Sequence, residues 1–163
     1  MASRDPKTLH PELAKRWALA EAAYRDKYPP PLPQVFITAA LRGNEEQDKL
    51  YAQGRTAPGQ IVTNARGGQS LHNYGLAFDV AFKTKTGSVD WSPIHFQRFA
   101  EIAKSFGLAW GGDWRRSKDF PHFEPPHFSW QSAAAGMKPV FPPLPPSVAS
   151  DVSPSAGQTH REP

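Results

Sequence analysis

Cysteine is absent from this chain of 163 residues. Its absence excludes disulfide bonds, thiol catalysis and any zinc site with cysteine ligands. A metal would therefore have to be held by histidine and carboxylate side chains. No run approaches the roughly 20 apolar residues that a membrane-spanning helix requires. The opening segment, MASRDPKTLHPELAKRW, also has no apolar core of a secretory signal. We therefore expect a cytoplasmically made chain without a signal peptide or stable membrane insertion.

An excess of one charge sign is absent as well. The chain has 19 Lys and Arg against 15 Asp and Glu, a net charge of +4, and the basic residues are scattered. This balance does not indicate nucleic-acid binding, although it favours approach to an anionic polymer such as a cell wall. A Pro- and Ser-rich stretch without periodicity begins near Gly136. We predict one catalytic domain over residues 1–135 and an extended or disordered tail over 136–163 that joins no core.

The apolar pattern predicts a mixture of short helices and strands. Expected helices span residues 11–28, 45–53 and 93–106, with Asn44 capping the second and Gly107 ending the third. Expected strands span residues 35–42, 76–82, 108–110 and 122–128, with a loop at 55–69 and a turn at 83–90. Together they predict a compact α+β domain, with helices packed against a small, mainly antiparallel sheet.

One acidic residue lies inside an apolar strand. In the run SLHNYGLAFDVAF, residues 70–82, Asp79 has His72 seven residues upstream. Burying an unpaired carboxylate costs on the order of several kcal/mol, so Asp79 requires a metal, a cation or exposure to water. The nearby imidazole favours a metal. Gly75 lets the chain turn between the two residues, so that both side chains can face one point.

A second segment, WGGDWRRSKDFPHFEPPHF, residues 110–128, offers the remaining groups. A catalytic zinc ion takes three protein ligands and keeps one open position for water. In a carboxylate-x-x-His unit the histidine binds the metal and the carboxylate transfers protons. Spacing alone does not decide which of two such units serves the zinc ion. The carboxylate of the unused unit would be a solvated surface group. The two units are Asp119 with His122, and Glu124 with His127.

These segments resemble a known family. The run YAQGRTAPGQIVTNARGGQSLHNYGLAFDVAF, followed by WGGDWRRSKDFPHFE, is similar to phage L-alanyl-D-glutamate endopeptidases, which are endolysins related to the VanY and VanX zinc D,D-peptidases. The resemblance covers residues 42–124 and implies the hedgehog/D,D-peptidase-like fold. Its motif Ser-x-His-x-x-Gly-x-Ala-x-Asp is complete within residues 70–79. Its second motif, Trp-Gly-Gly-Asp-Trp and then Asp-x-x-His-Phe, is complete within residues 110–123.

The resemblance implies a role for each of several residues. The implied zinc ligands are His72, Asp79 and His122. Asp119 is implied as the catalytic carboxylate, with Glu124 and His127 as the alternative unit. Arg42 would stabilise an oxyanion or bind the D-glutamate carboxylate. Further substrate-binding candidates are Ser70, Trp110 and Trp114. Ser70 is equally suited to capping a turn, and large aromatic residues near a Gly-Gly turn are more often part of the core.

The implied function is zinc-dependent hydrolysis of the L-alanyl-D-glutamate bond in peptidoglycan stem peptides. Zinc would lower the pKa of its water to about 7, and Asp119 would transfer the proton. The resemblance further implies a phage lysis enzyme that reaches the cell wall through a holin pore, and the alternative is a bacterial housekeeping enzyme with another export route. We expect a monomer. Two alternatives are a D-alanyl-D-alanine carboxypeptidase or dipeptidase with the same metal site, and a binding module without catalysis. The complete set of ligands and carboxylate favours an enzyme.

Overall fold

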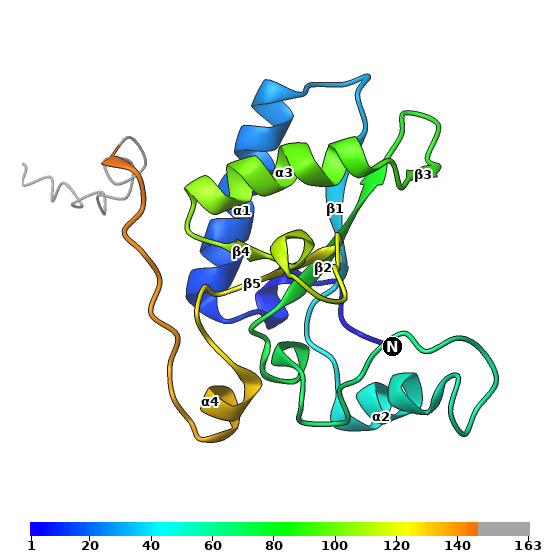
Figure 1. The fold of residues 1–163 in the computed structure, drawn as a ribbon. Helices are drawn as coiled ribbons and strands as arrows, with labels where there is room; N and C mark the ends of the chain where they lie inside the picture. The colour runs from blue at the N-terminus through cyan, green and yellow to red at the C-terminus, as the bar shows by residue number, and fades with distance from the viewer. Residues whose placement is uncertain (147–163) are drawn as a thin grey trace, which may run out of the picture.

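The computed structural model describes residues 1–146, in which helices pack against a small sheet (Figure 1). The strand order in this part of the chain is β1-β2-β5-β4, and β3 pairs with β2 off this path. The strands are β1 Gln34–Ala39, β2 Phe78–Lys83, β3 Val89–Asp90, β4 Ala109–Trp110 and β5 His122–Glu124. Their pairings are antiparallel. The predicted α+β class is therefore confirmed.

The longest helices lie together on one side of the sheet (Figure 1). These helices are α1 Pro11–Lys27 and α3 Pro93–Ser105. Two shorter helices, α2 Asn44–Ala52 and α4 Trp130–Ala134, lie near one end of β2, and β3 lies near the other end. Single 3-10 turns form at η1 Pro6–Thr8, η2 Leu71–Tyr74 and η3 Gly111–Asp113. Asn44 is the first residue of α2 and not its cap, since Gly43 occupies that position. No helix within residues 1–146 has the length and apolar composition needed to cross a bilayer.

The alternation of β2 separates the core from the opposite face of the sheet. Phe78, Val80 and Phe82 are fully buried and pack with aromatic rings of the long helices, as between Phe78 and Trp17 at 5.3 Å. Successive strand residues point to opposite faces. Asp79 therefore projects away from the core formed by its neighbours, which explains how a carboxylate is accommodated in an apolar run.

Strand β5 is shorter than predicted. It ends at Glu124 and not at residue 128, because Pro125 and Pro126 follow and proline has no N–H to donate to a sheet ladder. The helix α4 was not predicted, since its five residues are too few to show a helical period.

The segment after α4 runs back along the domain, drawn in orange in Figure 1. Phe141 and Leu144 pack against the core. The buried Arg16 donates a hydrogen bond to the carbonyl of Pro142 at 2.6 Å, and its guanidinium lies 4.8 Å from the centre of the Phe141 ring. The expectation that the tail joins no core is wrong for these residues, because the buried donors of Arg16 need acceptors and this segment supplies one. The tail predicted beyond residue 146 lies outside the described residues.

Candidate metal centre

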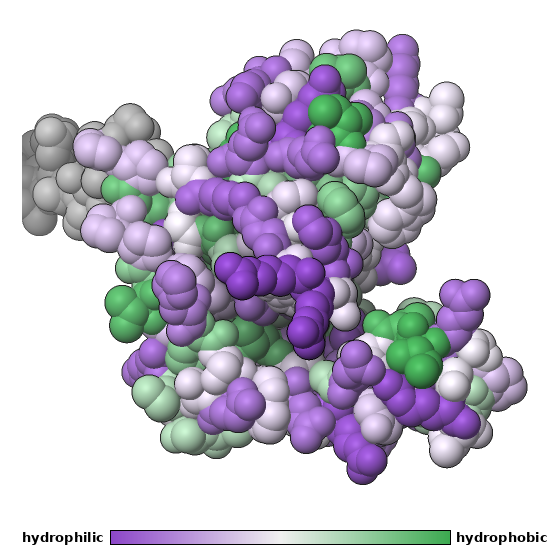
Figure 2. All heavy atoms as spheres, in the orientation of Figure 1, coloured by the Kyte–Doolittle hydropathy of each residue, from purple (hydrophilic) through white to green (hydrophobic). Residues whose placement is uncertain are grey.

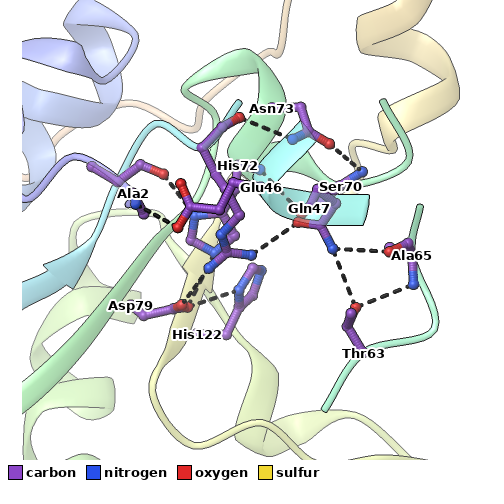
Figure 3. A network of polar contacts seen from close by, with 12 residues as sticks. Ala2, Glu46, Gln47, Thr63, Ala65, Ser70, His72, Asn73, Asp79 and His122 are labelled. Carbon is purple, nitrogen blue, oxygen red and sulfur yellow. Dashed lines mark hydrogen bonds and ion pairs between the residues drawn. The ribbon is translucent and has the colours of Figure 1, made fainter. Parts of the chain in front are cut away.

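Three side chains from separate elements converge on the face of the sheet opposite the core (Figure 3). Asp79 on β2 lies directly across from His122 on β5, and residues paired in this way project from the same face. His72 reaches the same point from η2. The ligand atoms of the three residues all lie within 4.8 Å of one another. The Oδ1 atom of Asp79 is 3.1 Å from His72 Nε2 and 3.2 Å from His122 Nδ1.

The turn η2 holds His72 in one orientation. Ser70 caps this turn, because its hydroxyl accepts a hydrogen bond from the N–H of His72 at 3.3 Å. Gly75 ends the turn at φ +65°, a left-handed conformation that favours glycine. The Nδ1 atom of His72 lies 2.8 Å from the carbonyl oxygen of Ala40. Since a carbonyl only accepts, Nδ1 carries the proton and Nε2 presents its lone pair to the centre.

The charges of the centre favour an ionised carboxylate. Burial opposes the charge of Asp79, but His72 and His122 outweigh it and hold the pKa of Asp79 well below its usual range. Burial alone would lower the pKa of His122, yet the carboxylates of Asp79 and Glu124 raise it well above its usual value. Two imidazole nitrogens and one carboxylate oxygen are a donor set that catalytic zinc sites use. The residues present therefore fit a zinc ion.

The centre opens into a cleft of about 980 Å³, whose lining includes Arg42, Ser70, Trp114 and Asp119. Figure 2 shows the hollow between two lobes of the surface. The ring of Trp114 lies 5.1 Å from that of His122 and is 37% exposed, so it forms part of the wall.

Trp110 lies in the core and not on the cleft wall, contrary to the expectation that it binds substrate. It is buried, and its indole N–H donates to the carbonyl of Phe120 at 2.7 Å. Its ring packs on Gly112, where a Cβ atom would collide with it. The absence of a side chain at Gly112 thus leaves room for the indole in the core.

Asp119 lies beside the metal ligands with a half-buried carboxyl group. Burial raises the pKa of this carboxyl, and the charge of Asp79 adds to the increase, whereas His122 opposes it. The backbone N–H of Asp119 donates to Gly111 at 3.1 Å, and its carbonyl accepts from the N–H of His122 at 3.3 Å. This turn keeps the two residues together. A carboxyl with a raised pKa suits a group that accepts and returns a proton.

Glu124 lines the same cleft, contrary to the expectation that the carboxylate of the unused unit is a solvated surface group. Its Oε2 atom lies 2.8 Å from His122 Nε2, and its side chain is 19% exposed. His127 is exposed, at φ +54°, beyond the end of β5. The group of potential ligands among residues 1–146 does not include His127. Glu124 and His127 therefore do not form a carboxylate-x-x-His unit at the centre. The pattern His-Phe-Glu in a strand predicts that the side chains of His122 and Glu124 lie on the same face, and this pattern could have indicated their contact.

Arg42 brings a cation to the centre. Its Nη2 atom lies 3.6 Å from Asp79 Oδ2, and Nη1 donates to Gln47 Oε1 at 3.0 Å. The buried Nε–H has no hydrogen-bond partner among the described residues. Gln47, which was not predicted as a site residue, donates in turn to the carbonyl of Ala65 at 2.9 Å (Figure 3). It thereby links the guanidinium to the loop on one side of the cleft.

The fold and the centre are those of a metallopeptidase, and comparisons with known proteins agree. A family model described as D-alanyl-D-alanine carboxypeptidase matches residues 63–125, which contain all three potential ligands. The peptidoglycan L-alanyl-D-glutamate endopeptidase CwlK of Bacillus subtilis (strain 168) is 44% identical over 128 residues, which are 73% of this chain and 74% of CwlK. The chain belongs to the M15 peptidase family.

Solved structures share the fold. The L-Ala D-Glu endopeptidase ChiX of Serratia marcescens is 22% identical with a TM-score of 0.55, over 77% of this chain and 88% of ChiX. A variant of the vancomycin-resistance D,D-pentapeptidase VanY, in complex with Zn(II), is 16% identical with a TM-score of 0.54, over 79% of this chain and 80% of VanY. At these identities the similarity concerns the fold alone, and it confirms the predicted D,D-peptidase-like domain.

Proposed function

We propose that this protein is a zinc-dependent endopeptidase that hydrolyses the L-alanyl-D-glutamate bond of peptidoglycan stem peptides. The observation that carries the proposal is the convergence of His72, Asp79 and His122 in a cleft that also holds Asp119. Support for the particular bond comes from the 44% identity to CwlK, whose name specifies that bond.

In this proposal His72, Asp79 and His122 hold the ion. A zinc ion, when bound, polarises the scissile carbonyl and lowers the pKa of water. Asp119 accepts the proton of the attacking water and returns it to the leaving amine. Its half-buried position and raised pKa suit both steps, since the carboxyl must be able to hold the proton between them.

Arg42 binds the substrate in this proposal. Its side chain is 13% exposed, lies beside Asp79 and lines the cleft. A fixed planar cation of this kind stabilises either the oxyanion of the transition state or the carboxylate of D-glutamate. Ser70 and Trp114 line the same cleft and contact the peptide.

Digestion of purified muropeptides, with products identified by mass spectrometry, tests the function. We expect cleavage between L-alanine and D-glutamate that a chelator stops and added zinc restores. The variant His72→Ala, checked by circular dichroism, should retain the fold and lose both bound zinc and cleavage. Release of D-alanine instead would favour a D-alanyl-D-alanine carboxypeptidase, the activity after which the matching family model is described. Full cleavage by His72→Ala would contradict the assigned centre.

The biological setting remains a prediction from the resemblance. We propose a monomeric phage lysis enzyme that reaches the cell wall through a holin pore. CwlK is a bacterial protein, so its similarity supports the activity and not the phage origin. Coexpression with a holin tests the route, since lysis should require both the holin and an intact His72. Sedimentation tests the monomeric state.

A further inference from the structure

Each imidazole of the centre has a partner on the nitrogen that faces away from the other ligands. The Nδ1 atom of His72 lies 2.8 Å from the carbonyl oxygen of Ala40, and Nε2 of His122 lies 2.8 Å from a carboxylate oxygen of Glu124. The two partners differ in kind, because one is a neutral backbone group and the other is an acidic side chain. The proposed function assigns no role to Glu124.

The contact with Glu124 determines which nitrogen of His122 is available to a metal. An ionised carboxylate has only acceptors, so the Nε2 atom that faces it carries a proton. The Nδ1 atom then faces Asp79 Oδ1 at 3.2 Å. A metal ion shared by these two atoms requires the lone pair of Nδ1, which the hydrogen bond on Nε2 leaves free.

The backbone holds Glu124 at this position. Glu124 and His122 are two residues apart on β5, so their side chains share one face of the sheet. Phe123, between them, is fully buried in the core, and Glu124 itself pairs with Ala109 of β4. The backbone of Glu124 is therefore fixed by a strand that is paired on both sides, and from this position the carboxylate reaches His122.

Its contacts distinguish Glu124 from Asp119. The Glu124 carboxylate is engaged with Nε2 of His122, on the side of the ring remote from Asp79. The Asp119 carboxylate has no hydrogen bond to a protein group among residues 1–146, although it lies in the same cleft. Asp119 is thus free to exchange a proton, whereas Glu124 is already bound to a ligand residue.

We propose that Glu124 is a positioning residue that holds the His122 ring with Nδ1 directed at the metal. The inference rests on the proposed function in one respect, since it takes the centre to bind zinc. The negative charge of Glu124 also makes His122 a more basic ligand, an effect that carboxylates hydrogen-bonded to metal-binding histidines have in other proteins. Glu124 would therefore contribute to zinc affinity through its contact with His122.

Zinc affinity, measured by competition with a chromophoric chelator, tests this role directly. Replacing Glu124 by Ala should weaken zinc binding by about 10–100-fold, the usual cost of removing such a partner. Glu124→Gln should lose less, because its amide oxygen still accepts from Nε2–H. The matched control is Asp119→Asn, which should bind zinc within about twofold of the wild type and yet lose most of its kcat.

Two outcomes would overturn the proposal. Wild-type zinc affinity in both Glu124 variants would show that the contact does not position His122. Unchanged zinc affinity together with a loss of kcat as large as that of Asp119→Asn would make Glu124 the proton-transfer group. If Glu124→Ala does not fold, Glu124→Met decides, since it removes the acceptor but keeps the length of the side chain, and wild-type zinc affinity in that variant would count against the role. Because zinc affinity needs no substrate, failure of the proposed cleavage would be recognised separately.

Discussion

At the scale of single residues, the cleft holds two carboxylates outside the group of potential metal ligands, and their surroundings differ. Asp119 is half-buried with its carboxyl oxygens unpaired by protein groups among residues 1–146, and burial raises its pKa. Glu124 is bound to a histidine at 2.8 Å. Environments that differ in this way can separate the tasks of two similar side chains, which supports the proposed roles of Asp119 in proton transfer and of Glu124 in holding His122.

Replacing Asp119 by Asn should lower kcat by about 10²–10⁴-fold, the typical contribution of a general base. Bound zinc, measured by atomic absorption on the purified variant, should remain. An Asp119→Asn enzyme with wild-type kcat would contradict the role of Asp119 and would direct attention to the other carboxylate in the cleft.

The same variant has a predicted effect on stability that depends on pH. Burial raises the folded-state pKa of Asp119 above its ordinary value of 3.8, so the ionised carboxyl opposes folding above the folded-state pKa. Below 3.8 the carboxyl is protonated in both states and has no effect. Metal-free Asp119→Asn should therefore melt at a higher temperature than the metal-free wild type at pH 7. The difference should disappear as the pH falls toward the ordinary value, and a lower melting temperature at pH 7 would contradict it.

At the scale of elements, α2 and the loop after it form one wall of the cleft. Arg55 donates to the carbonyl of Thr63 at 3.0 Å and stacks on the ring of Tyr51 at 4.1 Å, so the loop is held by polar contacts. Ile61 and Val62 line the cleft and are each 57% exposed. Figure 2 shows hydrophobic side chains exposed on this lobe beside the hollow. Ile61 and Val62 are thus exposed to the cleft in a loop that polar contacts hold in place, and this arrangement suits contact with a substrate.

The double variant Ile61→Ser with Val62→Ser should raise KM for muropeptides by roughly 5–30-fold, from the loss of about 1–2 kcal/mol of apolar contact. The kcat should stay near the wild-type value, because contacts remote from the reacting bond stabilise substrate and transition state alike. The matched control is Val89→Ser on β3, which is 43% exposed and lies outside the cleft. An unchanged KM in the double variant would show that the substrate does not touch this wall.

The turn η2 depends on one glycine. Gly75 has φ +65°, and a Cβ atom there would lie 2.7 Å from the backbone oxygen of Thr8. Gly75→Ala should therefore destabilise the protein by about 2 kcal/mol, of which roughly 1–2 kcal/mol is the cost of a left-handed conformation. Zinc affinity should fall as well, because His72 lies in the same turn. Gly136→Ala is the control for the collision, since Gly136 also has a left-handed φ of +75° but a Cβ there meets nothing within 4 Å. It should keep wild-type zinc affinity, and thermal melting compares the two variants.

At the scale of the whole molecule, one buried side chain of α1 connects segments that are far apart in the sequence. Arg16 of α1 is only 3% exposed and donates to Phe106 after α3 and to Pro142 after α4. A buried guanidinium requires such acceptors, since an unpaired buried charge is costly. The segment over residues 137–146 therefore completes the packing around α1 although it has almost no regular secondary structure of its own.

A chain that ends at residue 136 should be less stable than one that ends at residue 146. The shorter chain loses the packing of Phe141 and Leu144 and one hydrogen bond of Arg16. We expect a loss of about 2 kcal/mol and a fall in melting temperature of roughly 4–8 °C. Comparing these two chains isolates residues 137–146 from whatever follows them. Equal melting temperatures would show that the contacts contribute little.

Much of the fold was predictable from local patterns. The helices α1 and α3 ended within one residue of their expected limits, because their apolar residues recur at the helical period over several turns. The end of β5 was predicted four residues too late, since the two prolines that follow stop the ladder. The short α4 carries too few residues for any period to show. Local patterns thus indicate long elements well and short ones poorly.

Parts of the metal centre were predictable from local patterns as well, and other parts were not. His72 and Asp79 belong to one short motif, in which a capped turn, a left-handed glycine and a strand place both side chains, so the linear order of residues suffices to predict them. The pairing of Glu124 with His122 required knowing that β5 is a strand and which face meets the cleft. The contacts of Arg16 with Pro142 and of Gln47 with Ala65 join segments far apart in the chain. Such contacts depend on how the elements pack, which residue order alone does not specify, because the same buried donor can be satisfied by many different carbonyl groups.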